Sequence, residues 1–590
     1  MTTAEALTVA IQHHQAGRLQ SAEQLYRQIL AAEPEHADAW HLLGFIAYQV
    51  GRMEIAIEYI EYAIRLEGHR AEFHHNLGDA YRASGKNVRA TACYQRALQL
   101  KPDLIESHYN LGLALEEQDR MAEAKTCQQQ ILWLRPLDPD RPLWRLRMAV
   151  LCPAVFQSPE AIDEYRQGLL LAAQGHPALN LAEHLTNLHA SNVQPPLNLI
   201  YQGRENRSLK EAYAKIFCYD RPADVRRGGV GRPQVGLLVT PSHEGIFLRF
   251  WQGIFQRMKT DRFQMVILCP QGGTSRFQAA VREDLVRLLP VPPRIEQAIE
   301  TIRGARLDVL YHWEVGTDAT NYFFPFFRLA PVQCTSLAIQ DTSGVAQIDY
   351  YLSSALVESE DAQRHYTEKL LSAKTLLTYY PRQTLPTTFK PREAFGLNPR
   401  QHVYLCAQNP RKIHPDFDAI LAGILGQDAA GIVVLVQDPE GCLAEKLRRR
   451  MTATIPEAAQ RIVFLPWQKY ADYLSLVAAA DVLLDPLYYS GGTTSYEALA
   501  LGKPIVTWPW RLQCGRTVLA FYRKMGIAGC VAGSAEEYVK MAVALGTQSE
   551  YREALGREIA AASGELFEDP RAVEEHVEIF ERLVEQARSG

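Results

Sequence analysis

The residues with the clearest chemical potential lie in one segment, DPLYYSGGTTSYEALALGKPIVTWP, at positions 485–509. An expected strand ends at the start of this segment, a loop with Gly491 and Gly492 follows, and Thr493 and Thr494 then open a helix. Free backbone amides at a helix N-terminus, two hydroxyls and little side-chain bulk suit a phosphate group. The alternative interpretation is an ordinary helix start that follows a glycine-rich turn.

A carboxylate and a lysine could complete such a site. Glu497 follows Thr493 by one helical turn, where it can accept hydrogen bonds from ribose hydroxyls. Lys412 lies in CAQNPRKIHPDF (406–417), a loop between an expected strand and helix, where it can neutralise a leaving diphosphate. A solvated surface lysine is the alternative.

Two further groups of residues deserve a chemical interpretation. Asp416 and Asp418 have D-x-D spacing, but after Pro415 they are better explained as acids that favour the first turn of a helix, so we expect no metal site. His243, in TPSHEGIF directly after another expected strand, could contact substrate or move a proton. A structural histidine is the alternative there.

The elements that must position these residues follow from the pattern of apolar runs. Short runs alternate with helix-length segments in two sets: QVGLLVT, QMVILCP, LDVLYHW and VQCTSLA, then HVYLCAQ, GIVVLVQD, RIVFLP, DVLLDP and PIVTW. This predicts two parallel sheets covered by helices on both faces, with a ligand cleft at the carboxyl ends of the strands. We therefore expect α/β domains at 231–385 and 386–565, a C-terminal helix at 566–590, and a helical connector at 140–230 that ends in a Gly-, Pro- and Arg-rich linker, 221–233.

The first 139 residues are an internal repeat. Small residues recur every 34 positions in several ladders: Gly17, Gly51 and Gly85; Gly44, Gly78 and Gly112; Ala22, Ala56, Ala90 and Ala124. This period predicts about four tetratricopeptide units, at 4–37, 38–71, 72–105 and 106–139, which stack into a superhelix. Asn76 and Asn110 share one helix position and could bind the backbone of an extended peptide in the groove; alternatively they are solvated or bond a neighbouring helix.

Composition limits the classes of protein. The chain has 590 residues, 47% of them hydrophobic, and a net charge of −5, which excludes a mainly disordered chain and nucleic-acid binding through bulk positive charge. The N-terminus lacks the features of a signal peptide, and no apolar run is long enough to cross a membrane. Ten scattered cysteines without a C-x-x-C pair predict free thiols, and we expect a cytoplasmic protein without nucleic-acid or membrane partners.

These segments, taken in order, resemble the O-GlcNAc transferase and SPINDLY family, in which tetratricopeptide repeats precede a GT-B glycosyltransferase region. The motifs that carry the resemblance are APVQ (330–333), DTSG (341–344), IDYYL (348–352), HYTEKLL (365–371), NPRKIHP (409–415) and SGGTTSYEALALGKPIVT (490–507). The resemblance covers nearly the whole chain and looks like that of a bacterial member. It implies inverting, metal-independent transfer of a sugar from a nucleotide diphosphate, with no further cofactor, to Ser or Thr hydroxyls of proteins.

The resemblance leaves the donor open. UDP-GlcNAc is the first expectation, GDP-fucose and UDP-glucose are close variants, and a repeat scaffold that binds nucleotide without transferring a sugar is the alternative from another class. A protein or peptide acceptor would bind the repeat groove. Whether the chain forms a homodimer stays open.

The resemblance also implies roles for individual residues. Lys412 would stabilise the departing diphosphate, and His243 matches a histidine of the cleft. The nucleotide-sugar would contact Asn409, Gly491, Gly492, Thr493, Thr494, Glu497, Tyr473 and Arg516. The sequence departs from the family pattern at Gly492 and Tyr473, where histidines are usual, and in LAIQDTSG (337–344) and Gly316-Thr317. No residue is singled out as the general base.

Overall fold

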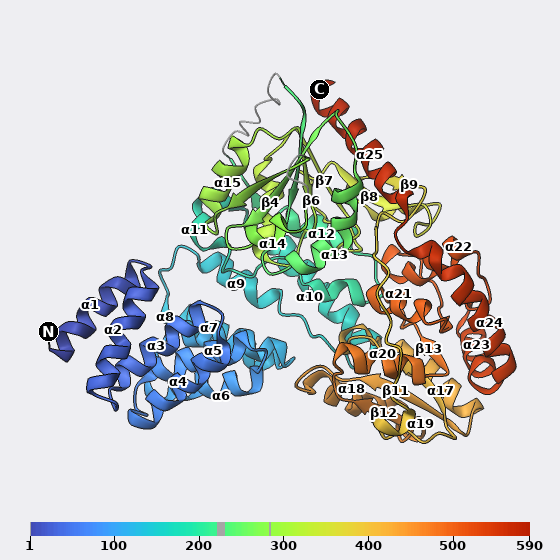
Figure 1. The fold of residues 1–590 in the computed structure, drawn as a ribbon, viewed down its shortest axis with the longest axis horizontal. Helices are drawn as coiled ribbons and strands as arrows, with labels where there is room; N and C mark the ends of the chain where they lie inside the picture. Colours follow the sequence, from blue (N-terminus) through green and yellow to red (C-terminus); the bar gives the residue numbers. More distant parts are fainter. Residues whose placement is uncertain (1, 221–230, 282–284, 590) are drawn as a thin grey trace. The chain divides into compact units, whose positions relative to one another are not determined.

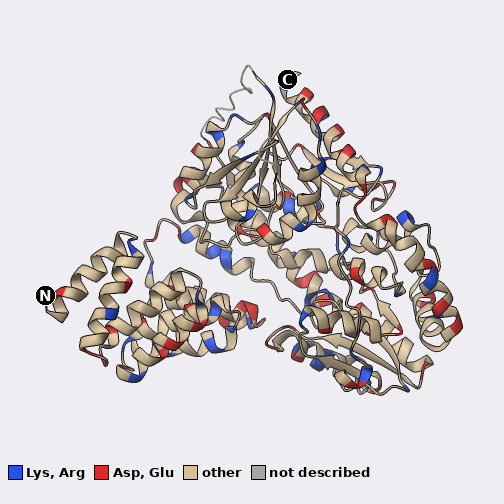
Figure 2. Cartoon of the chain, in the orientation of Figure 1, with Lys and Arg blue, Asp and Glu red and all other residues tan. Residues whose placement is uncertain are grey.

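The computed structural model describes residues 2–220, 231–281 and 285–589 (Figure 1). The chain divides into two compact units. One unit extends to Pro153 and includes Pro439–Cys442, and the other contains the remainder. Acidic and basic side chains are interspersed along the helices of both units, in keeping with the small net charge (Figure 2).

The smaller unit consists of antiparallel helix pairs that follow the predicted 34-residue period. The pairs are α1 (Thr3–Gln15) with α2 (Leu19–Ala32), α3 (Ala37–Gln49) with α4 (Met53–Leu66), α5 (Ala71–Ala83) with α6 (Asn87–Leu100), and α7 (Ile105–Glu117) with α8 (Met121–Leu134). The turn inside each pair needs a left-handed residue, and Gly17, Gly51 and Gly85 supply it with φ of 72°, 78° and 70°. Asp119 takes the same conformation, with φ of 59°, in the fourth pair.

The second glycine ladder lets the two helices of a pair approach closely, as predicted. A Cβ atom at Gly44 would lie 2.7 Å from Cγ1 of Ile60, and one at Gly78 would lie 2.5 Å from the ring of Tyr94. Gly112 is less constrained, because its nearest neighbour would be Nε2 of Gln128 at 3.4 Å. The repeat prediction is therefore confirmed in both its period and its packing.

The larger unit contains two parallel sheets. The first has the order β5-β4-β3-β6-β7-β8-β9, made from β3 (Gln234–Leu238), β4 (Gln264–Pro270), β5 (Val286–Val291), β6 (Val309–His312), β7 (Val332–Ser336), β8 (Tyr350–Ser354) and β9 (Lys369–Ala373). The four predicted runs form β3, β4, β6 and β7. The strands β5 and β9 lie at the edges, and β8 lies beside β9. The edge strands are only partly buried, so they lack the continuous apolar run of a central strand.

The second sheet has the order β12-β11-β10-β13-β14. Its strands are β10 (His402–Cys406), β11 (Gly431–Val436), β12 (Ile462–Leu465), β13 (Val482–Leu484) and β14 (Ile505–Val506), and each one falls in a predicted apolar run. Asp416 and Asp418 lie in the first turn of α17 (Asp416–Gln427), as expected, and Asp418 forms a buried ion pair with Arg450.

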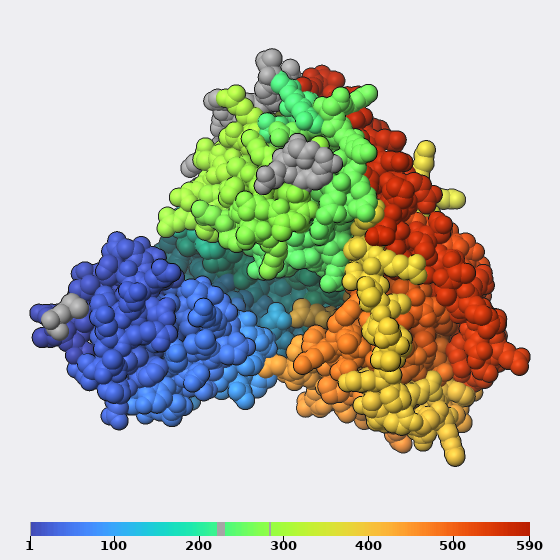
Figure 3. All heavy atoms as spheres, viewed as in Figure 1, coloured from blue at the N-terminus to red at the C-terminus, as the bar shows by residue number. Residues whose placement is uncertain are grey.

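A helical connector lies between the repeats and the first sheet in sequence, and a long helix follows the second sheet. The connector contains α9 (Arg141–Ala149), α10 (Pro159–Gly175), α11 (Leu185–Leu188) and α12 (Arg207–Ala214), together with a short parallel pair that was not predicted, β1 (Leu179–Asn180) and β2 (Phe217–Cys218). Residues 221–230 of the predicted linker lie outside the described residues. The last helix, α25 (Pro570–Ser589), packs on the core of the first sheet, and Figure 3 shows its atoms in red against the green first-sheet region.

None of the ten cysteines forms a disulfide bond, in agreement with the predicted thiols. Among the described residues, no helix combines the length and hydrophobicity that a membrane span requires.

Candidate functional site

In both sheets the strand order reverses at a central strand: strands that follow it in sequence are added first on one side and later on the other. This topology determines where a ligand can bind. In the second sheet, β10 is followed in sequence by β11 on one side, while β13 pairs on its other side. The loops after β10 and β13 therefore diverge and leave a crevice at the carboxyl ends of the strands. Lys412 lies after β10 and Thr493 after β13, so the fold brings the two strongest sequence segments to one crevice.

A chain of hydrogen bonds joins these two loops. Nζ of Lys412 donates to Oε1 of Gln408 at 2.8 Å, and Nε2 of Gln408 donates to Oγ1 of Thr494 at 2.6 Å. A side chain at Gly491 would collide with this bridge, because its Cβ would lie 2.6 Å from Nε2 of Gln408. Gly491 is therefore required where the two loops meet. Sequence reasoning missed Gln408, whose only signal was its place in the loop after a strand.

Asp485 stabilises the loop after β13 through hydrogen bonds. Its carboxylate is buried and accepts hydrogen bonds from the amide of Gly491 at 2.8 Å, from Oγ1 of Thr507 at 2.8 Å and from the hydroxyl of Ser490. Burial raises the pKa of Asp485 to about 6, although these donors and the Lys412 charge act against it. The sequence pointed to this residue only as the end of a strand.

The Lys412 ammonium lies in a partly apolar environment. Burial lowers the pKa of Lys412 to about 8, and Asp485 partly opposes this change. The ammonium nitrogen lies 4.7 Å from the centre of the Tyr489 ring, and that ring packs edge-on against Tyr201 with centroids 4.8 Å apart. Such a lysine is half-buried and held in place, unlike the solvated surface lysine of the alternative interpretation.

Glu497 lies on α21 (Thr493–Ala500) and is buried. Burial raises its pKa, while hydrogen bonds from Tyr470 and Tyr473 and the charge of Arg249 lower it. The hydroxyl of Tyr473 also donates to the carbonyl of Thr494 at 3.4 Å. The predicted ribose carboxylate is thus held beside two tyrosine rings.

Asn409 and Arg516, which are also predicted to contact the nucleotide, differ in their surroundings. Asn409 is exposed at the start of the Lys412 turn, where its Oδ1 accepts from the amide of Arg411 at 3.0 Å. The Arg516 guanidinium donates to the carbonyl of Val357 at 2.6 Å and also to the carbonyls of Trp510 and Glu358. Arg516 therefore ties the second sheet's region to the loop after β8, and its contact with a nucleotide stays a prediction.

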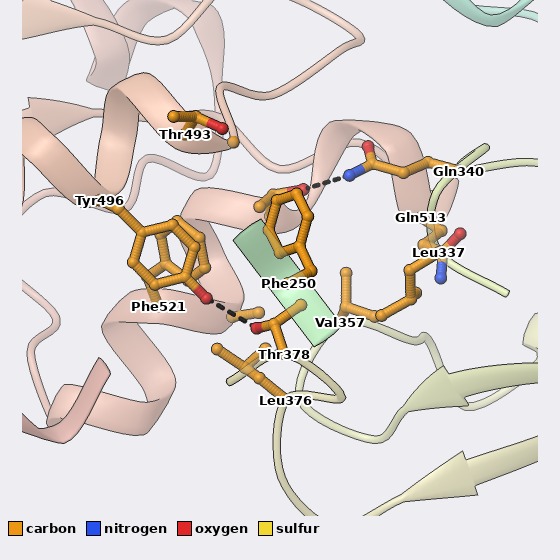
Figure 4. Close-up of a pocket in the computed structure, with 13 residues that line it drawn as sticks. Phe250, Leu337, Gln340, Val357, Leu376, Thr378, Thr493, Tyr496, Gln513 and Phe521 are labelled. Atoms are coloured by element: carbon orange, nitrogen blue, oxygen red, sulfur yellow. Dashed lines mark hydrogen bonds between the residues drawn. The ribbon is translucent and has the colours of Figure 1, made fainter. Parts of the chain in front are cut away.

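Figure 4 shows a small cavity where the two sheet regions meet, with a volume of about 110 Å³. Phe250 and Thr378 line it from the first region, and Thr493 and Tyr496 from the second. The hydroxyls of Thr378 and Tyr496 are hydrogen-bonded at 2.9 Å across this boundary. Gly492 and Thr493, at the start of α21, therefore face residues of both regions.

On the first sheet, His243 lies after β3 at the start of α13 (Glu244–Arg257). Its Nδ1 is 2.6 Å from Oε2 of Glu314, a residue that follows β6. This hydrogen bond raises the pKa of His243 despite partial burial. Thr317, next to Gly316, donates to the same carboxylate at 3.3 Å. With Nδ1 bonded to a carboxylate, Nε2 of His243 is the nitrogen left to accept a proton.

The DTSG motif is hydrogen-bonded to the glutamate of the HYTEKLL motif. Glu368 is buried, and it accepts from Oγ1 of Thr342 at 2.6 Å and from the amide of Ser343 at 2.7 Å. Nζ of Lys210 donates to the carbonyl of Thr342 at 2.8 Å and pairs with Asp341 at 2.7 Å. These contacts hold residues 341–343 against α12 and against the segment that leads into β9.

The asparagines of the repeat unit bond neighbouring repeats. Nδ2 of Asn76 lies 2.8 Å from Nε2 of His41, and Nδ2 of Asn110 donates to Oδ1 of Asp79 at 2.8 Å. This is the alternative that the sequence left open. Their use in a peptide groove stays a prediction.

Comparisons with known proteins match both parts of the chain. Tetratricopeptide repeat models match residues 13–74, 78–119 and 105–136, and the Glycosyl transferase family 41 model matches residues 380–570. A probable UDP-N-acetylglucosamine–peptide N-acetylglucosaminyltransferase SPINDLY of Hordeum vulgare is 25% identical over 51% of this chain and 30% of its own length. The corresponding SPINDLY of Eustoma exaltatum is 24% identical over 59% of this chain and 39% of its own. The chain thus spans well under half the length of these relatives.

A solved structure matches the whole fold. A mutant of the Thermobaculum terrenum O-GlcNAc transferase has a TM-score of 0.54 and 20% identity, and the match covers 99% of this chain and 98% of that one. This likeness establishes the order of the repeats and the two sheets as a known architecture.

Proposed function

We propose that this chain, a member of the O-GlcNAc transferase and SPINDLY family by its repeats and its family 41 region, is a glycosyltransferase that transfers a sugar to Ser or Thr hydroxyls of proteins. The donor is a nucleotide diphosphate sugar, with UDP-GlcNAc as the first candidate. Transfer proceeds with inversion and without a metal ion. The repeat unit binds the protein acceptor.

The observation that carries this proposal is the bridge from Lys412 through Gln408 to Thr494. It holds one cation and one hydroxyl at the N-terminus of α21, a combination that complements a diphosphate. Glu497 and Tyr473 lie beside it and would contact the ribose and the base. The positive charge needed to hold the diphosphate comes from Lys412 itself.

The proposed steps of sugar transfer follow from the positions of Lys412 and His243. The acceptor hydroxyl oxygen bonds to the anomeric carbon from the face opposite the diphosphate, and the bond from that carbon to the diphosphate oxygen breaks. The electron pair passes to the diphosphate, whose growing negative charge Lys412 neutralises. We assign the hydroxyl proton to Nε2 of His243, which Glu314 orients through Nδ1.

The test is a donor screen. The purified chain is incubated with lysate protein and radiolabelled UDP-GlcNAc, UDP-glucose or GDP-fucose, and label in protein is measured. Transfer from one donor is expected, with a loss of about a thousandfold in Lys412→Ala, since removal of one stabilising charge has effects of this order. Lys540→Ala, an exposed lysine on α23 (Ala535–Thr547), serves as the matched control.

The same screen can also contradict the proposal. Nucleotide binding measured by calorimetry, together with no transfer from any of the three donors, would favour the nucleotide-binding scaffold and refute the enzyme.

A further inference from the structure

The first sheet has a crevice of its own, apart from the loop between β13 and α21. Its order changes direction between β3 and β6, because β4 and β5 continue on one side of β3 while β6 to β9 continue on the other. A cavity of about 550 Å³ lies at the carboxyl ends of these strands. It is lined by 238–241 at and after the end of β3, by 270–272 and 291–293 at the ends of β4 and β5, by residues that follow β6, and by His189 of the connector.

Position and size together indicate a binding site. Ligands of open α/β sheets bind where the strand order reverses, and small-molecule sites in proteins have volumes of about 300 to 1,000 Å³. The second sheet uses the equivalent crevice for Lys412 and Thr494. The cavity on the first sheet meets the same two criteria, yet none of the residues proposed for the donor lines it.

The lining specifies the chemistry of the ligand. Most of the wall is apolar and comes from the proline- and valine-containing ends of β3, β4 and β5. Two carboxylates, Glu314 and Asp318, border the cavity on the β6 side. No lysine or arginine occurs among the described residues that line it. Such a site complements a positive charge carried on an apolar body.

Both carboxylates are held in place before any ligand arrives. Glu314 is bonded to His243 and Thr317. Asp318 caps α16 (Ala319–Phe323) by accepting from the amide of Asn321 at 2.9 Å. Burial raises the pKa of Asp318, so a cation nearby would relieve the cost of keeping its charge away from water. Fixed charges of this kind cost little reorganisation on binding.

We propose that this cavity binds an organic cation with an apolar body. Its ammonium or guanidinium group lies against Glu314 and Asp318, and its hydrocarbon part lies against the walls formed by 238–241 and 291–293. The cation is either a free amine or a Lys or Arg side chain of a polypeptide. Binding of a free amine is independent of the proposed transferase activity, whereas binding of an acceptor side chain rests on it.

The first experiment measures binding to the full chain by calorimetry, without donor. Phenethylamine, phenethyl alcohol and phenylacetate share one skeleton and differ in charge. Phenethylamine is expected to bind at least about tenfold more tightly than the other two, the effect of one charged hydrogen bond. The double variant Glu314→Gln with Asp318→Asn is expected to remove this preference. Glu300→Gln, an exposed acid on α15 (Ile295–Gly304), is the matched control and keeps it.

A second variant makes the result independent of any damage to folding by the double substitution. Thr320→Trp places a large ring in the cavity and leaves both carboxylates intact. It is expected to abolish phenethylamine binding. Equal affinity for the amine and the alcohol, or unchanged amine binding in Thr320→Trp, would overturn the proposal.

The source of the cation is decided by competition. A Ser-containing peptide with Lys, and the same peptide with norleucine in place of Lys, are titrated against bound phenethylamine. Displacement by the Lys peptide alone supports a polypeptide side chain as the ligand, and displacement by neither supports a free amine. Because no sugar donor is present, a chain that fails to transfer sugar can still pass this test, and an active enzyme can fail it.

Discussion

Gln408 joins the two loops of the proposed donor site. It holds the Lys412 ammonium with its oxygen and the Thr494 hydroxyl with its nitrogen. Gln408→Ala removes both bonds, and we expect kcat/KM to fall about ten- to a hundredfold, the value of a hydrogen bond to a charged group. Steady-state kinetics with the donor found in the screen measures this. Gln437→Ala, in the loop after β11, is the control; a Gln408→Ala enzyme as active as its control would contradict the role.

The alkaline side of the pH profile reports Lys412. Burial lowers its pKa to about 8, so the free enzyme loses the ammonium charge as the pH rises through that value. In the proposed mechanism the charged form stabilises the leaving diphosphate, and kcat/KM should therefore decrease above about pH 8. The profile of Lys412→Arg should lack this decrease, because arginine stays charged. A wild-type profile that remains flat up to pH 10 would show that Lys412 does not titrate as its burial predicts.

The acidic side of the profile reports His243, if it takes the proton of the acceptor. Its pKa is raised above 6.5 by the hydrogen bond to Glu314, and only the neutral imidazole can act as a base. Activity should therefore rise with pH, with a midpoint above 6.5. Glu314→Gln removes the carboxylate charge, so the midpoint should move to lower pH. A midpoint unchanged in this variant would exclude His243 as the titrating group.

Residues of the site could be predicted from sequence when their own loop carried the signal. Lys412, Thr493 and Glu497 follow strands, so residue type and position were enough to predict that they lie at one crevice; their contacts with a nucleotide sugar stay predictions. Gln408 and Asp485 acquire their roles from contacts between the loops after β10 and β13, which no local pattern encodes.

At the scale of elements, the glycines Gly78 and Gly112 of the repeats differ in how closely they are packed, so their substitution by alanine should change stability by different amounts. Gly78→Ala would place a methyl group against the ring of Tyr94, and we expect a loss of about 1–3 kcal/mol in the stability of the repeat unit from overpacking. Gly112→Ala meets only an ordinary contact with Gln128 and should be neutral or stabilising by up to about 1 kcal/mol, since alanine favours helices. Urea unfolding followed by amide exchange of α5 and α7 distinguishes the two. Equal destabilisation by both substitutions would refute the packing argument.

Strands were predictable where the sequence carries an uninterrupted apolar run. All five strands of the second sheet and four of the first met this condition, whereas β8, which is buried but reads YYLSS, was not predicted. The edge strand β9 alternates exposed and buried residues, and β5 carries Arg287 and Pro290, so neither resembles a buried strand in sequence. Their pairing in the sheet, rather than their composition, makes them strands.

At the scale of the whole molecule, the last helix returns from the second sheet to the first. Where α25 begins, Asp569 is paired with Lys524 at 2.5 Å and accepts from Thr375 at 2.8 Å. Near its end, Arg588 pairs with Asp308 at 2.9 Å, beside β6. The sequence predicted a C-terminal helix at 566–590 but could not indicate which sheet its apolar face would cover.

The apolar face of α25 therefore completes the core of the first sheet, and Phe580 tests this. Its ring is fully buried and lies 6.3 Å from Trp251 and 6.2 Å from Tyr311, measured between ring centres. Phe580→Ala should cost about 3–5 kcal/mol, as for other buried aromatic residues, and the loss should appear as faster amide exchange in β3 and β6 as well as in α25. Glu578→Ala, on the exposed face of the same helix, should leave exchange unchanged. If Phe580→Ala speeds exchange only within α25, the helix is an appendage, and the first sheet holds its crevice without it.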